Sequence, residues 1–371
     1  MAIAAALGGA IVGSRGDRDE DGDRPRRVGT GTPRAGDPRR APAAARLTLE
    51  QQVGQMLVMS FDGVQAPEYI RRRLRAGEGA GVILFGKNVP DARSLKALTG
   101  SLQGAARGGA LVATDQEGGP IRSVSFAPPE PSQAALASPE TARTAASAGA
   151  RGLRQGGVNV NLAPVADVAT PGSVLSGRAY PGDARAVGRL VKAAVLAHAR
   201  EGVGATAKHF PGLGRATANT DDAPATVAAQ RSDLAASDLP PFRAAAAADV
   251  PLVMTSHALY PALDRGRIAS QSPIVIERIL RGELGFRGAV ITDSIEAQAV
   301  IARSNVALAA ERAVAAGTDL VLMTGSGSWN LIYPRLLRRA RASASFRERV
   351  EESAGRVLAL KRRLRLRAPR S

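Results

Sequence analysis

Polar side chains suited to acid–base chemistry stand at the ends of the short apolar runs of this 371-residue chain or shortly after them. They are Asp62, Lys87, Asn88, Asp115, Glu117, Asp167, Lys208, His209, His257, Asp293 and Thr324. Carboxylates surrounded by Lys, His and Arg suit glycosidic cleavage, in which one group protonates the leaving oxygen and a carboxylate attacks or stabilises the anomeric carbon. An isolated Asp after a strand is often only a helix cap, so the interpretation rests on the number of such residues.

Several other chemistries have no signal in the sequence. There is no cysteine, which excludes disulfides, thiolate zinc sites and cysteine catalysis, and the only histidines are His198, His209 and His257. No P-loop and no nucleophile elbow are present. A metal site made of carboxylates alone, as in a barrel aldolase or lyase, stays open as an alternative, although no ligand spacing indicates one. We therefore expect neither a metal ion nor another cofactor.

The apolar runs that carry these residues are almost continuous, as in strands buried on both faces of a sheet. They span residues 55–61, 81–85, 110–115, 158–163, 204–210, 251–257, 289–293 and 319–324. Helical patterns separate them at 139–155, 184–201, 274–281 and 304–316, with Ser138 and Asp183 as caps of the first two. Eight alternations predict an α/β fold, a single-domain (β/α)8 TIM-type barrel whose strand ends meet at one rim. An open doubly wound sheet is the alternative, but no GxGxxG follows the first run.

The two ends of the chain differ from the barrel in composition. Residues 1–12 are apolar and similar to part of a signal peptide or an anchor, and residues 13–46 predict a disordered linker because they are rich in Gly, Pro, Arg and Asp. The barrel domain is expected at 47–366, including a basic C-terminal helix, with a tail at 367–371. We expect a secreted or membrane-anchored protein, with a cytoplasmic one as the alternative.

The formal net charge of +17 is concentrated near the C-terminus, where residues 335–370 contain 13 basic and 3 acidic residues. We interpret this segment as a solvated helix face with a frayed tail, and association with an anionic surface is the alternative. No zinc-finger or aromatic-rich nucleic-acid motif accompanies the arginines, so no nucleic-acid partner is expected. We expect a monomer with a carbohydrate substrate.

Six strings of the sequence resemble glycoside hydrolase family 3, and within it the single-domain bacterial β-N-acetylglucosaminidases. They are TDQEGGPIR (114–122), NVNLAPVADV (159–168), GRAYPGD (177–183), AKHFPGLG (207–214), MTSHALYPALD (254–264) and ELGFRGAVITDS (283–294). The strings keep the family's order over residues 47–325 and coincide with the predicted strands.

The resemblance implies a retaining exo-β-glycosidase that removes terminal β-linked N-acetylglucosamine from cell-wall glycans through a covalent glycosyl-enzyme. The nucleophile falls on Asp293, and the sugar-binding residues fall on Asp115, Arg178, Lys208 and His209. His257 matches a family position on the sixth strand and is expected to line the pocket. Structural support of the barrel rim is the alternative role for His209 and His257.

Two departures from the family pattern concern catalysis. Ser123 stands where the family usually has an arginine, and Arg122, one residue earlier, is expected either to replace it or to point elsewhere. The Asp-Ser-His segment that supplies the acid/base in these glucosaminidases is here Asn219, Thr220 and Asp221. Asp221 is therefore the candidate acid/base, provided that burial or the charge of Asp293 raises its pKa.

Three questions remain open at this point. Asp222 is the next candidate for the acid/base. Two alternative functions stay open. The protein is either a weak or inactive homologue that only binds glycan, or an enzyme specific for glucosides or xylosides. Trp329, the only tryptophan, is expected either to stack on sugar near the rim or to fill space under the C-terminal helix.

Overall fold

The computed structural model describes residues 43–369. The predicted segment 1–12 and the predicted linker up to residue 42 lie outside these residues. The described chain begins with the 3₁₀ turn η2 (Ala43–Arg46), in which Ala44 is buried against Ala354 and Leu358. Ala44 is therefore packed on the barrel domain although it precedes the predicted boundary at residue 47.

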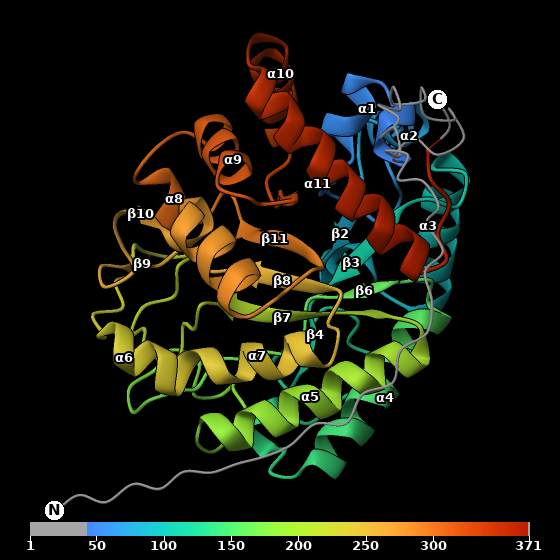
Figure 1. Cartoon of the computed structure of the whole chain (residues 1–371). Coiled ribbons are helices and arrows are strands. Elements are labelled where there is room, and N and C mark those ends of the chain that lie inside the picture. The colour runs from blue at the N-terminus through green and yellow to red at the C-terminus, as the bar shows by residue number, and fades with distance from the viewer. Residues whose placement is uncertain (1–42, 370–371) are drawn as a thin grey trace, which may run out of the picture. The chain divides into compact units, whose positions relative to one another are not determined.

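Eight parallel strands in the described part of the chain close into a barrel, in the order β1, β12, β11, β8, β7, β6, β3, β2 (Figure 1). Their bounds are β1 (Leu57–Met59), β2 (Gly81–Leu84), β3 (Leu111–Thr114), β6 (Val160–Asn161), β7 (Gly204–Phe210), β8 (Leu252–Thr255), β11 (Ala289–Ser294) and β12 (Leu320–Leu322). Each strand lies within one of the eight predicted apolar runs, except that β11 extends one residue further. The predicted (β/α)8 barrel is confirmed.

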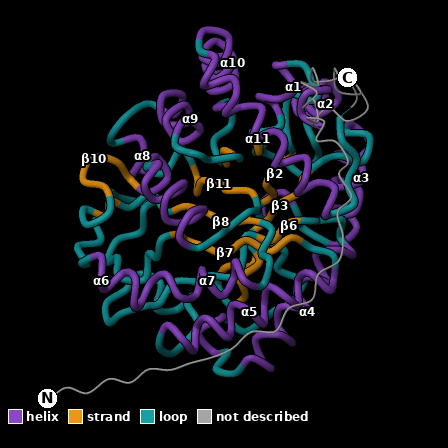
Figure 2. The backbone as a smooth tube through the Cα atoms, in the orientation of Figure 1, coloured by secondary structure: helices purple, strands orange, loops and turns teal. Residues whose placement is uncertain are grey.

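Helices surround the strands, as the purple and orange tubes of Figure 2 show. The α-helices are α1 (Leu49–Gly54), α2 (Glu68–Ala76), α3 (Ala92–Ala105), α4 (Pro139–Gln155), α5 (Ala184–Glu201), α6 (Arg231–Asp233), α7 (Leu239–Ala247), α8 (Gln298–Ile301), α9 (Val306–Ala315), α10 (Ser328–Ala342) and α11 (Ala344–Arg363). The π-helices are η5 (Leu234–Asp238) and η7 (Ile274–Glu283), and further 3₁₀ turns are η3 (Gly86–Asn88), η4 (Gln133–Ala135) and η6 (Ala269–Gln271).

The helix ends follow local capping chemistry. Helices α4 and α5 have the predicted bounds, and their predicted caps Ser138 and Asp183 accept the backbone N–H of Thr141 and Ala186. The pattern at 274–281 becomes the π-helix η7, and the pattern at 304–316 becomes α9, which begins later because Asn305 caps it.

Alternate strand residues divide between two apolar clusters, because successive side chains of a strand point to opposite faces. Ile83 of β2 belongs to the cluster that contains Met254 and Ile291 from distant strands. Its neighbours Val82 and Leu84 belong instead to a cluster with residues of the outer helices. The barrel interior is therefore filled with side chains.

Two short hairpins that the apolar pattern did not predict follow barrel strands. The pair β4 (Gln116–Gly118) and β5 (Ile121–Arg122) follows β3, and the pair β9 (Leu259–Tyr260) and β10 (Asp264–Ile268) follows β8. Both hairpins stand at the carboxyl ends of strands, and the first carries residues of the candidate site.

Helices α10 and α11 are held to the barrel by many of the basic residues that we expected to be solvated. Ion pairs are formed by Arg335, Arg339, Arg341, Arg349, Arg356 and Arg363. The interpretation of this segment as a solvated face was therefore wrong for Arg349 and Arg356, whose side chains are only 13% and 21% exposed. Between residues 43 and 369, no helix combines the length and the apolar character needed to cross a bilayer.

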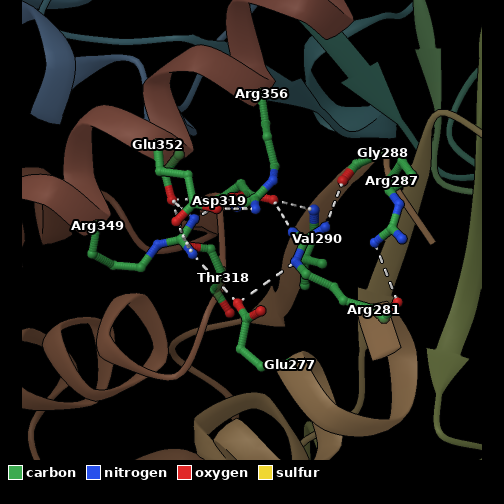
Figure 3. A network of polar contacts seen from close by, with 11 residues as sticks. Glu277, Arg281, Arg287, Gly288, Val290, Thr318, Asp319, Arg349, Glu352 and Arg356 are labelled. Atoms are coloured by element: carbon green, nitrogen blue, oxygen red, sulfur yellow. Dashed lines mark hydrogen bonds and ion pairs between the residues drawn. The ribbon is translucent and has the colours of Figure 1, made fainter. Parts of the chain in front are cut away.

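Asp319 is the centre of the largest of these ion-pair networks (Figure 3). Its fully buried carboxylate lies 2.6 Å from Arg281, 3.1 Å from Arg349 and 3.1 Å from Arg356. The backbone N–H of Val290 also donates to it, at 2.8 Å. Because Asp319 directly precedes β12, the network joins α11 and η7 to the amino ends of the strands, away from the rim that carries the site.

Candidate active site

A cavity of about 390 Å³ opens at the carboxyl ends of the barrel strands. It is lined by Phe85, Gly86, Asp115, Glu117, Pro120, Ile121, Arg122, Ser123, Arg178, Lys208, His209, Leu213, Asn219, Thr220, Asp221 and Asp293. Seven of the eight residues that the sequence nominated for catalysis or sugar binding are in this lining, and His257 is the one that is not.

A quartet of two cations and two carboxylates forms one wall of the cavity. The Lys208 ammonium lies 2.6 Å from Asp115 and 2.7 Å from Glu117. Arg178 donates to both carboxylate oxygens of Glu117, at 2.9 and 2.7 Å. Burial opposes the charge on Glu117, but Lys208 and Arg178 outweigh it and lower its pKa to about 2. Burial lowers the pKa of Lys208, but Asp115 and Glu117 outweigh this effect and raise it above its ordinary value, so the Lys208–Glu117 pair stays ionised.

These four residues come from three separate segments of the rim. Asp115 follows β3, and Glu117 lies in β4, where the hairpin turns back so that Ser123 N–H donates to the Asp115 carbonyl. Arg178 comes from the loop before α5. Lys208 lies near the end of β7, where the pairing register with β8 shifts between Ala207 and Phe210. Such an irregularity re-aims side chains, and the consecutive residues Lys208 and His209 both line the cavity.

The imidazole of His209 lies between two carboxylates. Its Nδ1 donates to Asp167 Oδ2 at 2.8 Å, and its Nε2 lies 3.9 Å from Asp293 Oδ2. Asp167 is fully buried and also accepts the backbone N–H groups of His209, at 3.1 Å, and Leu213, at 2.6 Å. Asp167 therefore fixes both the ring and the backbone of the segment that follows β7.

Asp293 lies near the end of β11, with its side chain 18% exposed toward the cavity. Burial alone would favour its neutral form, but the nearby His209, His257 and Lys208 lower its pKa below the ordinary value. The backbone N–H of Ser294 also donates to Asp293 Oδ1, at 2.8 Å. The carboxylate is consequently ionised over the neutral pH range, as a nucleophile requires.

Asp221 lines the same cavity with the opposite electrostatic balance. Burial of its carboxyl, followed by the negative charge of Asp293, raises its pKa to about 6. More than a third of its surface is still open at the cavity mouth, so a bound ligand that expels water would increase this shift. The backbone of its loop is held by α8, whose Gln298 and Ala299 N–H groups donate to the carbonyls of Asp221 and Thr220.

Arg122 lines the cavity from strand β5. Among the described residues its guanidinium has no carboxylate partner, unlike Arg178, which is bound to Glu117. Arg122 is therefore a free cation on the cavity wall, positioned by the β4–β5 hairpin.

His257 is placed differently from the expectation that it lines the pocket. It is fully buried, its Nε2 lies 2.8 Å from the Ser294 carbonyl, and its Nδ1 lies 2.7 Å from Ser270 Oγ. Because a carbonyl only accepts, Nε2 carries the proton and Nδ1 accepts from the serine. This arrangement matches the alternative role, in which His257 supports the end of β11 next to Asp293.

Other nominated residues also lie outside the cavity lining. Trp329 stacks on Tyr333 with ring centroids 4.4 Å apart, and the Arg73 guanidinium lies 3.8 Å above it, so it fills space between α2 and α10. Asp62 and Lys87 pair with each other at the rim. Asp222 is not in the lining.

Glu117 and Asp167 are the important residues to which the sequence gave a position but no role. Their only signal was their place directly after a predicted strand. Within residues 43–369, no group of three or more His, Asp and Glu side chains is arranged to hold a metal ion. The chemistry that the arrangement supports is carried by two carboxyl groups, Asp293 with a lowered pKa and Asp221 with a raised pKa, and the four charged side chains lie beside them.

The comparisons with known proteins agree with this geometry. The family described as "Glycosyl hydrolase family 3 N terminal domain" matches residues 48–360. A protein of Arthroderma benhamiae named "Uncharacterized secreted glycosyl hydrolase" is 32% identical over 87% of this chain and 96% of its own length. A "Beta-hexosaminidase" of Xanthomonas campestris pv. campestris (strain B100) is 34% identical over 72% of this chain and 84% of its own.

The solved structures include a glycoside hydrolase family 3 β-N-acetylglucosaminidase from Paenibacillus sp. str. FPU-7. It superimposes with a TM-score of 0.81 at 36% identity and covers 86% of this chain. This chain spans 63% of the length of that protein. The barrel and the order of its elements are thus shared with a solved glycosidase.

Proposed function

The chain belongs to glycoside hydrolase family 3, and from that premise we propose that it is a retaining exo-β-N-acetylhexosaminidase acting on cell-wall glycans. It is a glycosidase by family, and its relatives include a β-hexosaminidase. The proposal concerns the terminal β-linked N-acetylglucosamine as substrate, a covalent glycosyl-enzyme as intermediate, and the residues that carry each step.

Asp293 is the proposed nucleophile. Its carboxylate is exposed to the cavity and held in the ionised form by His209, His257 and Lys208. It attacks the anomeric carbon while the glycosidic oxygen departs, and a second displacement by water releases the sugar with retained configuration. One oxygen of Asp293 accepts from Ser294, which leaves the other to form the new bond.

Asp221 is the proposed acid/base. A carboxyl with a pKa near 6 is protonated in a useful fraction of molecules at mildly acidic pH and can give its proton to the leaving oxygen. Once Asp293 is esterified, its negative charge is lost, the pKa of Asp221 falls, and Asp221 can accept a proton from the incoming water. Retention requires the two carboxyl groups to come within about 5–5.5 Å of each other around bound substrate.

The charged quartet is the proposed sugar-binding wall. Asp115 uses one oxygen for Lys208, and its side chain is 24% exposed, so the other oxygen is open to a pair of sugar hydroxyl groups. Two arginines can donate to the N-acetyl and ring substituents. Arg178 is 24% exposed, and Arg122 has no carboxylate partner among the described residues. His209 contributes from beside Asp293.

One observation carries the proposal: two carboxyl groups on one cavity, Asp221 and Asp293, have pKa values displaced in opposite directions. The test is a panel of aryl β-glycosides of N-acetylglucosamine, glucose and xylose. We expect the N-acetylglucosaminide to be cleaved fastest and Asp293→Ala to lose roughly 10³-fold or more in kcat. Asp221→Ala should keep activity only on substrates with good leaving groups, and added azide should restore turnover as a β-glycosyl azide.

Asp222→Ala is the matched control, since it removes the neighbouring carboxylate outside the cavity lining and should leave all rates unchanged. Wild-type turnover in Asp293→Ala would reject the nucleophile assignment. Glycan binding without turnover of any substrate would reject the hydrolase in favour of a binding protein, and fastest cleavage of a glucoside or xyloside would reject the sugar.

We also propose that the protein acts outside the cytoplasm. The similarity to a protein named as secreted and the apolar character of residues 1–12 support this location. In this proposal residues 1–12 direct export or anchoring, 13–42 link them to the barrel domain, and the last residues form a short tail. Expression of the full chain fused to a reporter that is active only outside the cytoplasm tests the location, and an inactive reporter would reject it.

A further inference from the structure

A second hollow lies on the molecule between β10, η6 and α9. Its volume is about 650 Å³, and it shares no lining residue with the catalytic cavity. Its polar lining consists of Arg267, Arg303, Arg312 and Gln271, and the remaining lining is apolar or small. Hollows of this size are typical of small-molecule sites in proteins.

The three arginines reach this hollow from three different segments. Arg267 lies in β10, Arg303 two residues beyond α8, and Arg312 in α9. All three are exposed, and within residues 43–369 none of their guanidinium groups has a carboxylate partner. By contrast, Arg335 of α10 is paired with Glu311, the neighbour of Arg312 on α9. The positive charge around the hollow is therefore not neutralised by the protein itself.

The nearest acidic residue of the hairpin is turned inward. Asp264 accepts the backbone N–H groups of Gly266, at 3.0 Å, and Arg267, at 3.1 Å. Its second oxygen accepts from Ser272 Oγ at 2.7 Å. Asp264 thus shapes the hairpin that carries Arg267, and no carboxylate is part of the lining.

Gln271 distinguishes this hollow from an ordinary basic surface. Its side chain is 7% exposed and lines the hollow, yet within residues 43–369 its Nε2 has no hydrogen-bond partner. A buried amide donor without a partner is unfavourable. The Nε2 of Gln271 is enclosed, and rotation of the amide toward a ligand oxygen in the hollow would satisfy it. Three guanidinium groups without a carboxylate partner among the described residues, together with one unpaired amide donor, form an arrangement that suits an oxyanion.

We propose that this hollow binds a saccharide unit bearing an anionic substituent, either a phosphate or a carboxylate. The substituent is held by the arginines and Gln271, and the remaining volume accommodates the sugar ring. The identification of the ligand as a saccharide rests on the proposed function. Helix α8 connects the two sites, because its first amides hold the Asp221 loop and its end leads to Arg303. The hollow would therefore engage a charged part of the same glycan outside the catalytic cavity.

Calorimetric titration of the full chain tests this proposal, with glucose 6-phosphate, glucuronate, glucose and inorganic phosphate as separate probes. Excess N-acetylglucosamine is present throughout to fill the catalytic cavity. We expect one or both of the anionic sugars to bind, glucose not to bind, and inorganic phosphate to bind more weakly than the sugar phosphate. The two anionic sugars show whether the substituent is phosphate or carboxylate.

Substitutions locate the binding. Arg303→Gln and Arg312→Gln should each weaken it about tenfold, as expected for loss of a charge-assisted hydrogen bond. Gln271→Leu should weaken it at least threefold without changing any charge, which separates a built site from general attraction. Arg265→Gln is the matched control, because this exposed arginine of the same hairpin is outside the lining.

The inference fails if neither anionic sugar binds, if glucose binds equally well, or if the three variants bind as tightly as Arg265→Gln. Inorganic phosphate that binds as tightly as glucose 6-phosphate would reject the saccharide. All four variants should cleave a neutral aryl glycoside at the wild-type rate. Failure of the proposed function can be distinguished from failure of this inference. The first appears as absent hydrolysis by the wild type, whereas the calorimetric titration still shows whether the anionic sugars bind.

Discussion

Nε2 of His209 lies 3.9 Å from Oδ2 of Asp293, and the opposite ring nitrogen is bound to the buried carboxylate of Asp167. Asp167 therefore fixes the imidazole ring through Nδ1, and the Nε2 edge of the ring faces the proposed nucleophile. Its position lowers the pKa of Asp293, in the same direction as His257 and Lys208. Asp167 acts on the reacting carboxylate only through His209, so we regard it as a positioning residue.

Asp167→Asn should impair catalysis through this ring. The variant removes the negative charge that holds Nδ1 and replaces one of two acceptors with a donor facing backbone N–H groups. His209 then no longer stabilises the Asp293 carboxylate, so the pKa of Asp293 rises. We expect kcat to fall at least roughly tenfold and the acid limb of the kcat–pH profile to move to higher pH. A fall in kcat without movement of the acid limb would indicate general loss of structure, and the position of the limb is therefore the deciding measurement.

The alkaline limb of the pH profile should report Asp221. Only its protonated form can donate to the leaving oxygen, so kcat/KM for a substrate with a poor leaving group should decline as the pH rises through about 6. In Asp221→Asn, assayed with an activated aryl leaving group, this limb should disappear because no acid is needed. Persistence of the same limb in the variant would assign it to another group, and Asp222→Asn should retain it.

Much of the fold and part of the site could be predicted from the sequence. The barrel strands are buried on both faces, so their apolar runs are a local signal. Lys208, Asp115 and Asp293 were identified because they stand at the ends of those runs. The hairpins β4–β5 and β9–β10 were not predicted, because strands of two to five residues with polar side chains leave no apolar run. His257 showed why position alone is insufficient: it lies at a strand end, but its ring is turned to the Ser294 carbonyl.

Interactions between distant segments were the other part that the sequence could not predict. Asp319 binds Arg281, Arg349 and Arg356, and nothing in the local pattern distinguishes these arginines from solvated ones. Trp329 likewise packs under Arg73, some 250 residues earlier in the chain. Such pairs become visible only when the barrel brings its first and last elements together.

Asp319→Asn should strongly destabilise the fold. The buried carboxylate accepts from three arginines, from Ser353 and from Val290 (Figure 3). The amide would leave those cations without their buried counter-charge and paired only with the more exposed Glu277 and Glu352. Removing one partner of a buried ion-pair network typically costs about 3–5 kcal/mol, which urea denaturation can measure. Glu68→Gln is the control, because it removes an exposed carboxylate paired with Arg71 and Arg75 and should cause no measurable change. Equal midpoints for the two variants would contradict a stabilising role for the network.

Because Lys361 is buried, we expect the free energy of unfolding to depend on pH in an unusual way. Its side chain is 2% exposed, its Nζ donates to Gln55 Oε1 at 2.7 Å, and among the described residues it has no carboxylate partner. Burial lowers the pKa of Lys361 from 10.5 to about 7. Between these two values the unfolded chain binds one more proton at this position than the folded chain, so this residue makes the free energy of unfolding rise with pH. Below about pH 7 both states are protonated, and the full cost of burying the charge is present.

Lys361→Met removes this dependence while nearly conserving volume. The difference in unfolding free energy between variant and wild type should favour the variant most below pH 7. It should shrink by about 1.4 kcal/mol per pH unit as the pH rises from about 7 towards 10.5, because there the wild-type lysine is neutral when folded. Urea titrations at several pH values measure the difference, and taking the difference cancels the titration of all other groups. Lys192→Met, at an exposed position on α5, should show no such trend, and an equally flat result for Lys361→Met would mean that the buried amine keeps its proton at neutral pH.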